Sequence, residues 1–347
     1  VQIGDVTVGY HAEYTAMTNA AVKYNSINTG KTDIAGNNQY YIQLGEELYN
    51  GDLKLQNTTD VFGRPSRYWE YKGAEVGTYV KNELLRKEYT AKVTGKDLYE
   101  LLGTSTIDEY GLSVVIDGVD KDSVNSAVFD KTSMVRSNTK AVGDTGNGTL
   151  TQVYVDTQSK QITISIINTY LAKANENYDT KDEDVSLTIY EVDNKGSIST
   201  PIYVKADGLT VPSYTVSVDD YDVANVAEND LFLVTLANGE IQSLQAPQIL
   251  SETSITNFKL HSYVTADGKQ YDYADTAMYD DAVLDKYDNQ NMKDVTYNVI
   301  LDNYGYLIGL ELNQDPDKYV FLTGLDGKYS NLSIKEADAN VIFVDGT

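Results

Sequence analysis

The chain contains no cysteine, only two histidines and only one tryptophan among its 347 residues. The absence of cysteine excludes disulfide frameworks, thiolate nucleophiles and zinc sites with cysteine ligands. His11 and His261 lie far apart in the sequence and no HExxH spacing occurs, so histidine alone cannot build a metal triad. Basic residues are also scarce, since 52 acidic side chains against 27 basic ones give a formal net charge of -25. A field of that sign repels phosphate backbones and anionic lipids, so we expect no nucleic-acid partner.

Long apolar runs are missing as well. The hydrophobic fraction of 41% is sufficient for folded cores. No stretch approaches the roughly 20 apolar residues that a membrane-spanning helix needs, so we expect no membrane span. A chain of 347 residues is long enough for two or three domains. It begins at Val1 without an apolar export segment, so we interpret it as a mature product or an excised part of a longer protein.

Tyrosine is abundant although the other aromatic residues are few, with 29 Tyr against 6 Phe. Tyrosine, threonine, valine and isoleucine suit half-buried strand positions. Turn signals separate short alternating runs at Lys72-Gly73, Asp117-Gly118, 157–160, 193–196, Asn238-Gly239 and Asp267-Gly268. We therefore predict a mainly β fold with two or more hairpin-rich β-sandwich or barrel-like domains and a few short helices.

The stretch NVILDNYGYLIGLELN, at residues 298–313, allows two interpretations. Its tyrosines and carboxylates would suit the lining of a catalytic cleft or the tip of a hairpin. Apolar residues alternate at period two on both sides of residues 302–305, and Gly305 suits a position with positive φ. Cross-strand packing of aromatic residues favours the hairpin.

Helices are expected at few places. Thr94 stands three residues before Asp97 and Gly103 follows the last helical turn, which indicates a capped helix between them. Residues 280–290 are a candidate for a second short helix, and residues 335–339 for a helical turn.

The domain organisation is predicted from these patterns. Tyr41, Leu44 and Leu48 recur at helical spacing and indicate a short helix in an N-terminal connector. Two prolines around a polar link, at residues 201–212, indicate a boundary farther along the chain. We therefore predict a connector, a first β-domain and a second β-domain at residues 1–48, 49–205 and 206–347.

Candidate catalytic patterns are weak. Residues 143–150, GDTGNGTL, have the glycines of a phosphate loop but not its Lys-Ser/Thr, so we expect a flexible turn. A Ser-His-Asp constellation lacks a supporting GxSxG elbow. Acidic runs at 182–184, 219–220 and 280–281 are best interpreted as solvated loops, because a glycosidase needs two carboxyl groups placed across a cleft.

Two binding patterns need separate mention. Asp179, Asp182 and Asp184 offer oxygen ligands without the spacing of an EF-hand, so a structural calcium ion is a secondary hypothesis there. Trp69, with Tyr68 and Tyr71, would stack on sugar rings only if all three shared a face, and strand alternation separates Tyr68 from the other two. We expect Trp69 to be a core residue. No residue is assigned a catalytic, cofactor-binding or metal-binding role.

Six segments of the chain have the character of recurring phrases. They are DVFGRPSRYWEYKGAEVGTYVK, YTAKVTGKDLYELLG, GNGTLTQVYVD, INTYLAKANENYD, YNVILDNYGYLIGLE and DANVIFVDGT. Together they resemble segments of the S-layer homology domain-containing surface proteins of gut Firmicutes. The resemblance covers nearly the whole chain and implies a region that follows the wall-anchoring repeats, which in such proteins bind secondary cell-wall polymer. The repeats are absent here, so we assign wall binding to no residue of this chain.

The sequence thus favours a non-catalytic structural component of a bacterial cell surface, extracellular and within the cell wall or S-layer. Its expected partners are further copies of itself or neighbouring surface proteins, with divalent cations as bridges between carboxylates. The alternative is a surface adhesin or carbohydrate-binding module that uses exposed tyrosine or tryptophan, followed by an extracellular glycoside hydrolase. Lys-Asn or Lys-Asp isopeptide bonds are a further hypothesis for stabilising domains without cysteine.

Overall fold

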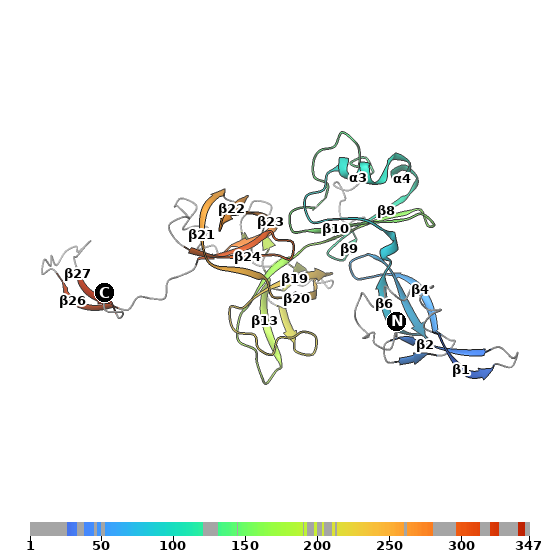
Figure 1. The fold of residues 1–347 in the computed structure, drawn as a ribbon, viewed down its shortest axis with the longest axis horizontal. Coiled ribbons are helices and arrows are strands. Elements are labelled where there is room, and N and C mark those ends of the chain that lie inside the picture. Colours follow the sequence, from blue (N-terminus) through green and yellow to red (C-terminus); the bar gives the residue numbers. More distant parts are fainter. Residues whose placement is uncertain are drawn as a thin grey trace.

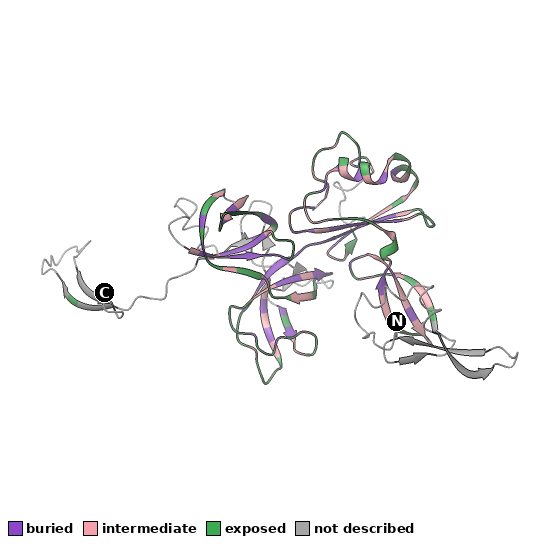
Figure 2. Ribbon diagram, viewed as in Figure 1, coloured by how far each residue is buried: buried purple, intermediate pink, exposed green. Residues whose placement is uncertain are grey.

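Strands dominate the computed structural model of the chain, which confirms the predicted mainly β fold (Figure 1). The described residues contain two α-helices and one short 3-10 helix, η2 (Asn82–Leu84). Figure 2 shows buried residues running along the strands of the larger sheets. The structure describes residues 26–32, 38–44, 47–49, 53–120, 131–143, 145–189, 191–192, 198–199, 203–204, 210–211, 214–259, 262–279, 296–312, 320–325 and 339–343.

Two three-stranded antiparallel sheets come first in the chain. The first consists of β1 (Ser26–Thr32), β2 (Asn38–Leu44) and β3 (Glu47–Tyr49). The second consists of β4 (Leu53–Thr59), β5 (Pro65–Tyr71) and β6 (Ala74–Val80).

The predicted helix at residues 41–48 is wrong, because this segment belongs to β2 and β3. Tyr40, Ile42 and Leu44 recur at every second position, and this period of two competes with the helical spacing of Tyr41, Leu44 and Leu48. Tyrosine and isoleucine favour strands, and β2 pairs with both of its neighbours. The pairing therefore decides against the helix.

A five-stranded sheet with two helices follows, with strand order β7-β10-β11-β8-β9. The pair β8–β11 is parallel and the other pairs are antiparallel. Both helices lie over one face of this sheet (Figure 1), where Leu98, Leu102 and Ile107 pack against the isoleucines of β11. The elements are β7 (Leu85–Tyr89), α3 (Gly95–Leu102), α4 (Thr104–Glu109), β8 (Gly111–Ile116), β9 (Val119–Asp120), β10 (Leu150–Asp156) and β11 (Gln161–Ile167).

A second five-stranded sheet is antiparallel throughout, with strand order β18-β13-β12-β19-β20. A domain boundary after residue 205 would divide this sheet, because β12 and β13 precede that position and the other three strands follow it. The strands are β12 (Tyr170–Ala174), β13 (Asp184–Ile189), β18 (Tyr214–Ser217), β19 (Leu231–Ala237) and β20 (Glu240–Gln245).

A closed five-stranded barrel follows the two five-stranded sheets, with strand order β21-β22-β23-β25-β24. Closure results from pairing of β24 with β21, and β23 pairs with β25 in parallel. The barrel core also includes Leu171 of β12 and Leu233 of β19, so the barrel packs against the preceding sheet. Its strands are β21 (Gln248–Lys259), β22 (Tyr263–Ala266), β23 (Lys269–Tyr279), β24 (Thr296–Leu301) and β25 (Leu307–Leu312).

Three two-stranded pairs complete the described elements, and all three are antiparallel. They are β14 (Glu191–Val192) with β15 (Ile198–Ser199), β16 (Tyr203–Val204) with β17 (Thr210–Val211), and β26 (Val320–Leu325) with β27 (Ala339–Phe343). The helix predicted at 280–290 lies outside the described residues, and so do residues 335–338 of the turn predicted at 335–339, whose last residue, Ala339, begins β27.

The predicted hairpins are confirmed where the structure describes their turns, and the turn predicted at 193–196 lies outside the described residues. Tight turns at Lys72-Gly73, Asn238-Gly239 and Asp267-Gly268 join consecutive antiparallel strands, and both residues of each pair have positive φ. The 298–313 stretch is also a hairpin, since β24 pairs with β25 through Asp302 to Gly305, and Gly305 has φ 85°. These pairs of positive φ match the twist of the strands that they join.

The predicted capped helix is confirmed as α3. The Thr94 side chain accepts a hydrogen bond from the Asp97 amide, and the Asp97 side chain accepts from the Thr94 amide, which forms a capping box. The Gly103 amide donates to the Tyr99 carbonyl at the other end of the helix. The cap fixes the start of the helix that covers the sheet core.

Thr94→Ala is expected to lower the free energy of unfolding by about 0.5–2 kcal/mol, because it removes the cap. Hydrogen bonds from Thr94 lower the pKa of Asp97, so this contribution is present above the ordinary aspartate pKa and is lost as pH falls through the lowered pKa. Urea unfolding of the wild-type and Thr94→Ala proteins, near neutral pH and at acidic pH, measures the loss of stability and its pH dependence. Ser105→Ala, at an exposed position in α4, is the control, and an equal loss in both variants would contradict the role of the cap.

Candidate functional site

The candidate catalytic residues from the sequence are not brought together in the described part of the chain. Both histidines, at positions 11 and 261, and the acidic pair at 280–281 lie outside it. Asp182, Glu183, Asp219 and Asp220 are exposed, in agreement with solvated acidic turns. Within the same residues, no group of three or more His, Cys, Asp or Glu is arranged to hold a metal ion, and no helix has the length and apolar character needed to cross a bilayer.

The calcium hypothesis concerns the turn between β12 and β13. Asp179 Oδ1 accepts hydrogen bonds from the amides of Lys181 at 2.7 Å and Asp182 at 3.2 Å. The Asp179 amide donates to the Asp184 carbonyl at 2.9 Å. The Asp179 carboxylate thus stabilises its own turn.

Trp69 is buried, as predicted, with 3% of its surface exposed. It lies on β5 between Leu55 of β4 and Gly77 of β6. The indole is therefore not available in this structure as a stacking platform for a sugar ring. An adhesin reading would need other aromatic residues, such as Tyr304, which is 38% exposed.

The prediction of a flexible turn at residues 143–150 is wrong for its second half. Gly146, Gly148 and Thr149 are buried, and residues 145–149, here called the glycine loop, contact the barrel. The Asp275 amide of β23 donates to the Asn147 carbonyl at 2.9 Å, and Asn147 Nδ2 donates to the Tyr273 carbonyl at 3.2 Å. The glycines serve close backbone approach between two parts of the chain.

The carboxylate of Asp117, in the turn between β8 and β9, accepts three hydrogen bonds from residues far along the chain. Its Oδ1 accepts from the Asn168 amide at 2.9 Å, and its Oδ2 accepts from Asn168 Nδ2 at 2.9 Å and from the Tyr170 hydroxyl at 2.7 Å. Its backbone carbonyl accepts from the Asn238 amide at 2.8 Å. One residue of the first five-stranded sheet therefore binds both the connection to the second sheet and the β19–β20 turn of that sheet.

Asn168 extends this network toward the glycine loop. It is 9% exposed and lies between the end of β11 at Ile167 and the start of β12 at Tyr170. Its Oδ1 accepts a hydrogen bond from Thr149 Oγ1 at 2.9 Å. The side chain of Asn168 is thus bonded at both its amide nitrogen and its carbonyl oxygen, which fixes the conformation of the connection between the sheets.

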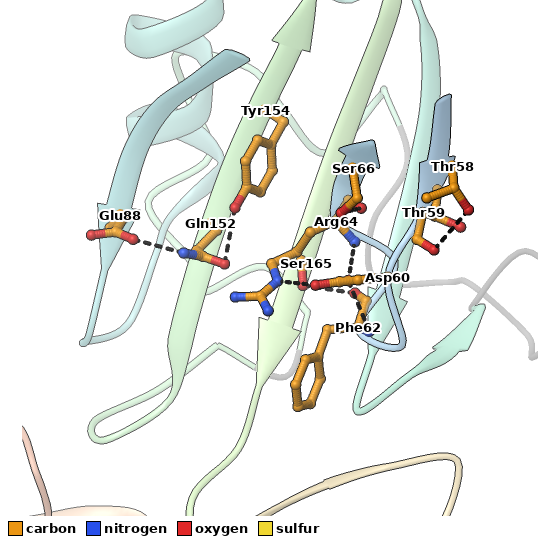
Figure 3. A network of polar contacts seen from close by, with 10 residues as sticks. All are labelled: Thr58, Thr59, Asp60, Phe62, Arg64, Ser66, Glu88, Gln152, Tyr154 and Ser165. Carbon is orange, nitrogen blue, oxygen red and sulfur yellow. Dashed lines mark hydrogen bonds and ion pairs between the residues drawn. The ribbon is translucent and has the colours of Figure 1, made fainter. Parts of the chain in front are cut away.

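A loop from the N-terminal part meets the Asp117 turn, the Asn168 connection and the β19–β20 turn, and we call this meeting point the central junction. Residues 60–64 lie against the face of the first five-stranded sheet that the helices leave free (Figure 3), and Ser165 Oγ donates to the Phe62 carbonyl at 2.8 Å. Phe62 packs with Ile167 and with Ala237 in one apolar cluster. Asp60 shapes the loop, because its Oδ2 lies 2.6 Å from Arg64 Nε.

The same face carries a chain of polar side chains on β7 and β10 (Figure 3). Gln152 Nε2 donates to Glu88 Oε1 at 2.7 Å, and the Tyr154 hydroxyl donates to Gln152 Oε1 at 3.2 Å. Burial raises the pKa of Tyr154, so the phenol remains protonated and acts as a donor. This network keeps the buried hydroxyl paired.

Gly118 lies directly against the backbone of two other segments at the central junction. A Cβ there would lie 2.7 Å from the Val61 carbonyl oxygen and 2.8 Å from the Asn238 amide nitrogen. The backbones at Val61, Gly118 and Asn238 therefore approach one another closely, because Gly118 has no side chain between them. The sequence identified Asp117-Gly118 as a turn but not as a docking point, because turn chemistry is local whereas the partners of this turn lie far along the chain.

Separate contacts hold the barrel against β12 and the connection that precedes it. Thr276 Oγ1 of β23 donates to the Thr169 carbonyl, and Lys173 Nζ lies 3.9 Å from Glu311 Oε1. The turn at residues 302–306 lies against the glycine loop, since a Cβ on Gly148 would lie 2.4 Å from Asp302 Oδ2. We call the glycine loop, β23 and this turn the barrel contact.

The arrangement therefore consists of docking surfaces. Polar and glycine residues of turns hold the two five-stranded sheets and the barrel against one another. Comparison with protein-family models, with curated proteins and with solved structures found no match for the chain.

Asp117→Ala is expected to lower the free energy of unfolding by roughly 2–4 kcal/mol, because it leaves the Asn168 and Tyr170 donors buried without their acceptor. Urea unfolding followed by tyrosine fluorescence measures the loss. Asp219→Ala, at an exposed turn position, is the control and is expected to change stability by less than about 0.5 kcal/mol. A loss no larger than that of the control would show that the carboxylate does not hold the junction.

Gly148→Ala is expected to weaken the barrel contact, because the new methyl group would approach Asp302 and Ala274. Gly268→Ala, in the β22–β23 turn, is the matched control, since it has similar positive φ and open space around it. Both substitutions place alanine at a positive φ and share that free-energy cost. The steric contacts at Gly148 should therefore make Gly148→Ala more destabilising by about 1–3 kcal/mol. Hydrogen exchange should rise at the Asp275 amide in Gly148→Ala only, and equal exchange in both variants would contradict the contact.

Proposed function

We propose that the chain is a non-catalytic structural part of a bacterial cell surface, in an S-layer or a similar coat. In this proposal it acts as a stiff extracellular spacer whose carboxylates face solvent and neighbouring molecules. The proposal draws on the resemblance to the region that follows the wall-anchoring repeats of S-layer homology domain-containing proteins.

The observation that carries the proposal is the shortness of the connections between the β units. Only Asn168 and Thr169 separate β11 from β12, and only Ala246 and Pro247 separate β20 from β21. Domain boundaries ordinarily fall in exposed flexible linkers that permit relative motion. Here the first of these connections is hydrogen-bonded through Asn168, which supports a spacer of fixed geometry.

The charge also supports this role. The net charge of -25 keeps the molecule hydrated and disfavours close approach of like molecules unless cations lie between them. Exposed acidic turns, such as Asp219-Asp220, are at the ends of strands where neighbouring molecules would meet. In the proposal, divalent cations bridge such turns between copies and so make lateral packing depend on calcium.

Electron microscopy of the purified chain, with calcium and with a chelator, tests the proposal. We expect ordered sheets or filaments with calcium and their loss on chelation. Asp117→Ala should reduce the order of such assemblies, whereas Asp219→Ala, which removes a carboxylate in an exposed turn, should change only their calcium dependence. Separate particles in every condition, or reproducible hydrolysis of a polysaccharide by the chain, would overturn the proposal.

A further inference from the structure

The turn at residues 302–306 buries a carboxyl group with one unpaired oxygen. Asp302 is 4% exposed. Its Oδ1 accepts hydrogen bonds from the amides of Tyr304 at 2.8 Å and Tyr306 at 2.9 Å. Its Oδ2 is buried and has no hydrogen-bond partner. An ionised carboxylate in this position would therefore have lost much of its hydration without full replacement.

This oxygen lies at the barrel contact and not within the barrel core. It lies so close to Gly148 that a Cβ there would be 2.4 Å away, and the same Cβ would lie 3.0 Å from Ala274 Cβ. The glycine loop, β23 and the 302–306 turn thus enclose the carboxyl group together. Separation of the barrel from the glycine loop would return Oδ2 to water.

The charged groups around the contact do not neutralise Asp302. The elements that enclose it contribute Asp275 from β23, next to Ala274, and Lys92 interacts with that aspartate. Glu88 of β7 and Asp302 both act on the Tyr304 phenol, whose pKa is raised mainly by burial. Among the ion pairs of the described residues, none includes Asp302.

We propose that Asp302 is a proton-binding site that couples the barrel contact to pH, so that proton uptake by its carboxyl group strengthens the docking of the barrel on the glycine loop. The inference rests on the geometry of the contact and is independent of the proposed cell-surface function. The ligand is the proton itself, and the two states are the docked barrel with neutral Asp302 and a loosened contact with hydrated carboxylate.

The direction of the effect follows from linkage. Burial raises the pKa of Asp302, although hydrogen bonds from the backbone of the turn partly oppose this shift. For a carboxyl group with a raised pKa in the docked state, the stabilisation is fully present below the ordinary aspartate pKa. It is lost as pH rises through the raised pKa. Acidification therefore strengthens this contact while it weakens the α3 cap.

Hydrogen exchange at the Asp275 amide reports the contact, because this amide donates to the Asn147 carbonyl across it. After correction for intrinsic exchange, we expect the opening constant to fall by up to about tenfold per unit decrease in pH, across the range in which Asp302 titrates. Asp302→Asn should remove this slope, since the amide is neutral at every pH. Asp267→Asn, in an exposed turn of the same barrel, should leave the slope unchanged.

Asp275 is the group that would otherwise explain such a slope, because burial raises its pKa as well. Asp275→Asn separates the two, and the proposal expects a pH slope to persist in this variant. A slope that survives in Asp302→Asn and disappears in Asp275→Asn would overturn the proposal.

A direct titration covers the case in which Asp302→Asn does not fold. Carboxyl carbon shifts of the wild-type chain, measured by NMR between acidic and neutral pH, give the midpoint for Asp302. The expected midpoint lies above the ordinary range of an aspartate side chain. A midpoint within or below that range would overturn the proposal without any variant.

Discussion

The carboxylate of Asp117 is the constraint on which the arrangement of the two five-stranded sheets depends. It accepts three hydrogen bonds from Asn168 and Tyr170, so the connection between the two five-stranded sheets has a fixed course. Its carbonyl binds the β19–β20 turn at Asn238. Since both oxygens of the side chain are satisfied by donors from one connection, the sheets are positioned by directional contacts, and the apolar cluster around Phe62 fills the space beside them.

Glycine residues allow these contacts to form between backbones. Gly118 lies against a carbonyl and an amide of two other segments, and Gly148 lies against the Asp302 carboxyl group. Hydrophobic cores stabilise each unit, but cores are tolerant of the exact orientation between units. Turns in which glycine brings hydrogen-bonding groups together specify that orientation, and they do so at the central junction and at the barrel contact alike.

Local chemistry explains what the sequence could predict. Lys72-Gly73, Asn238-Gly239 and the Thr94–Asp97 cap act over a few residues, so their turns and helix start were predictable. The parallel pairs β8–β11 and β23–β25 join segments that no hairpin connects, and no local signal predicts them. The role of residues 145–149 was missed for the same reason, since their partners, such as Asp275, lie in the barrel. The burial of Asp302 likewise depends on the glycine loop, which lies far from it in the sequence, so no local pattern predicts it.

The pairing order of the first five-stranded sheet determines when this sheet can fold while the chain is being synthesised. β8 finds its parallel partner only in β11, and β7 finds its partner only in β10, so residues 85–116 have no complete sheet until the chain has been made through Ile167. Contacts of such sequence separation slow folding because loop closure precedes any gain from pairing. The edges of β7 and β8 therefore stay unpaired until the later strands have been synthesised. Charged side chains on β7, namely Arg86, Lys87 and Glu88, are suited to oppose aggregation of nascent chains during that interval.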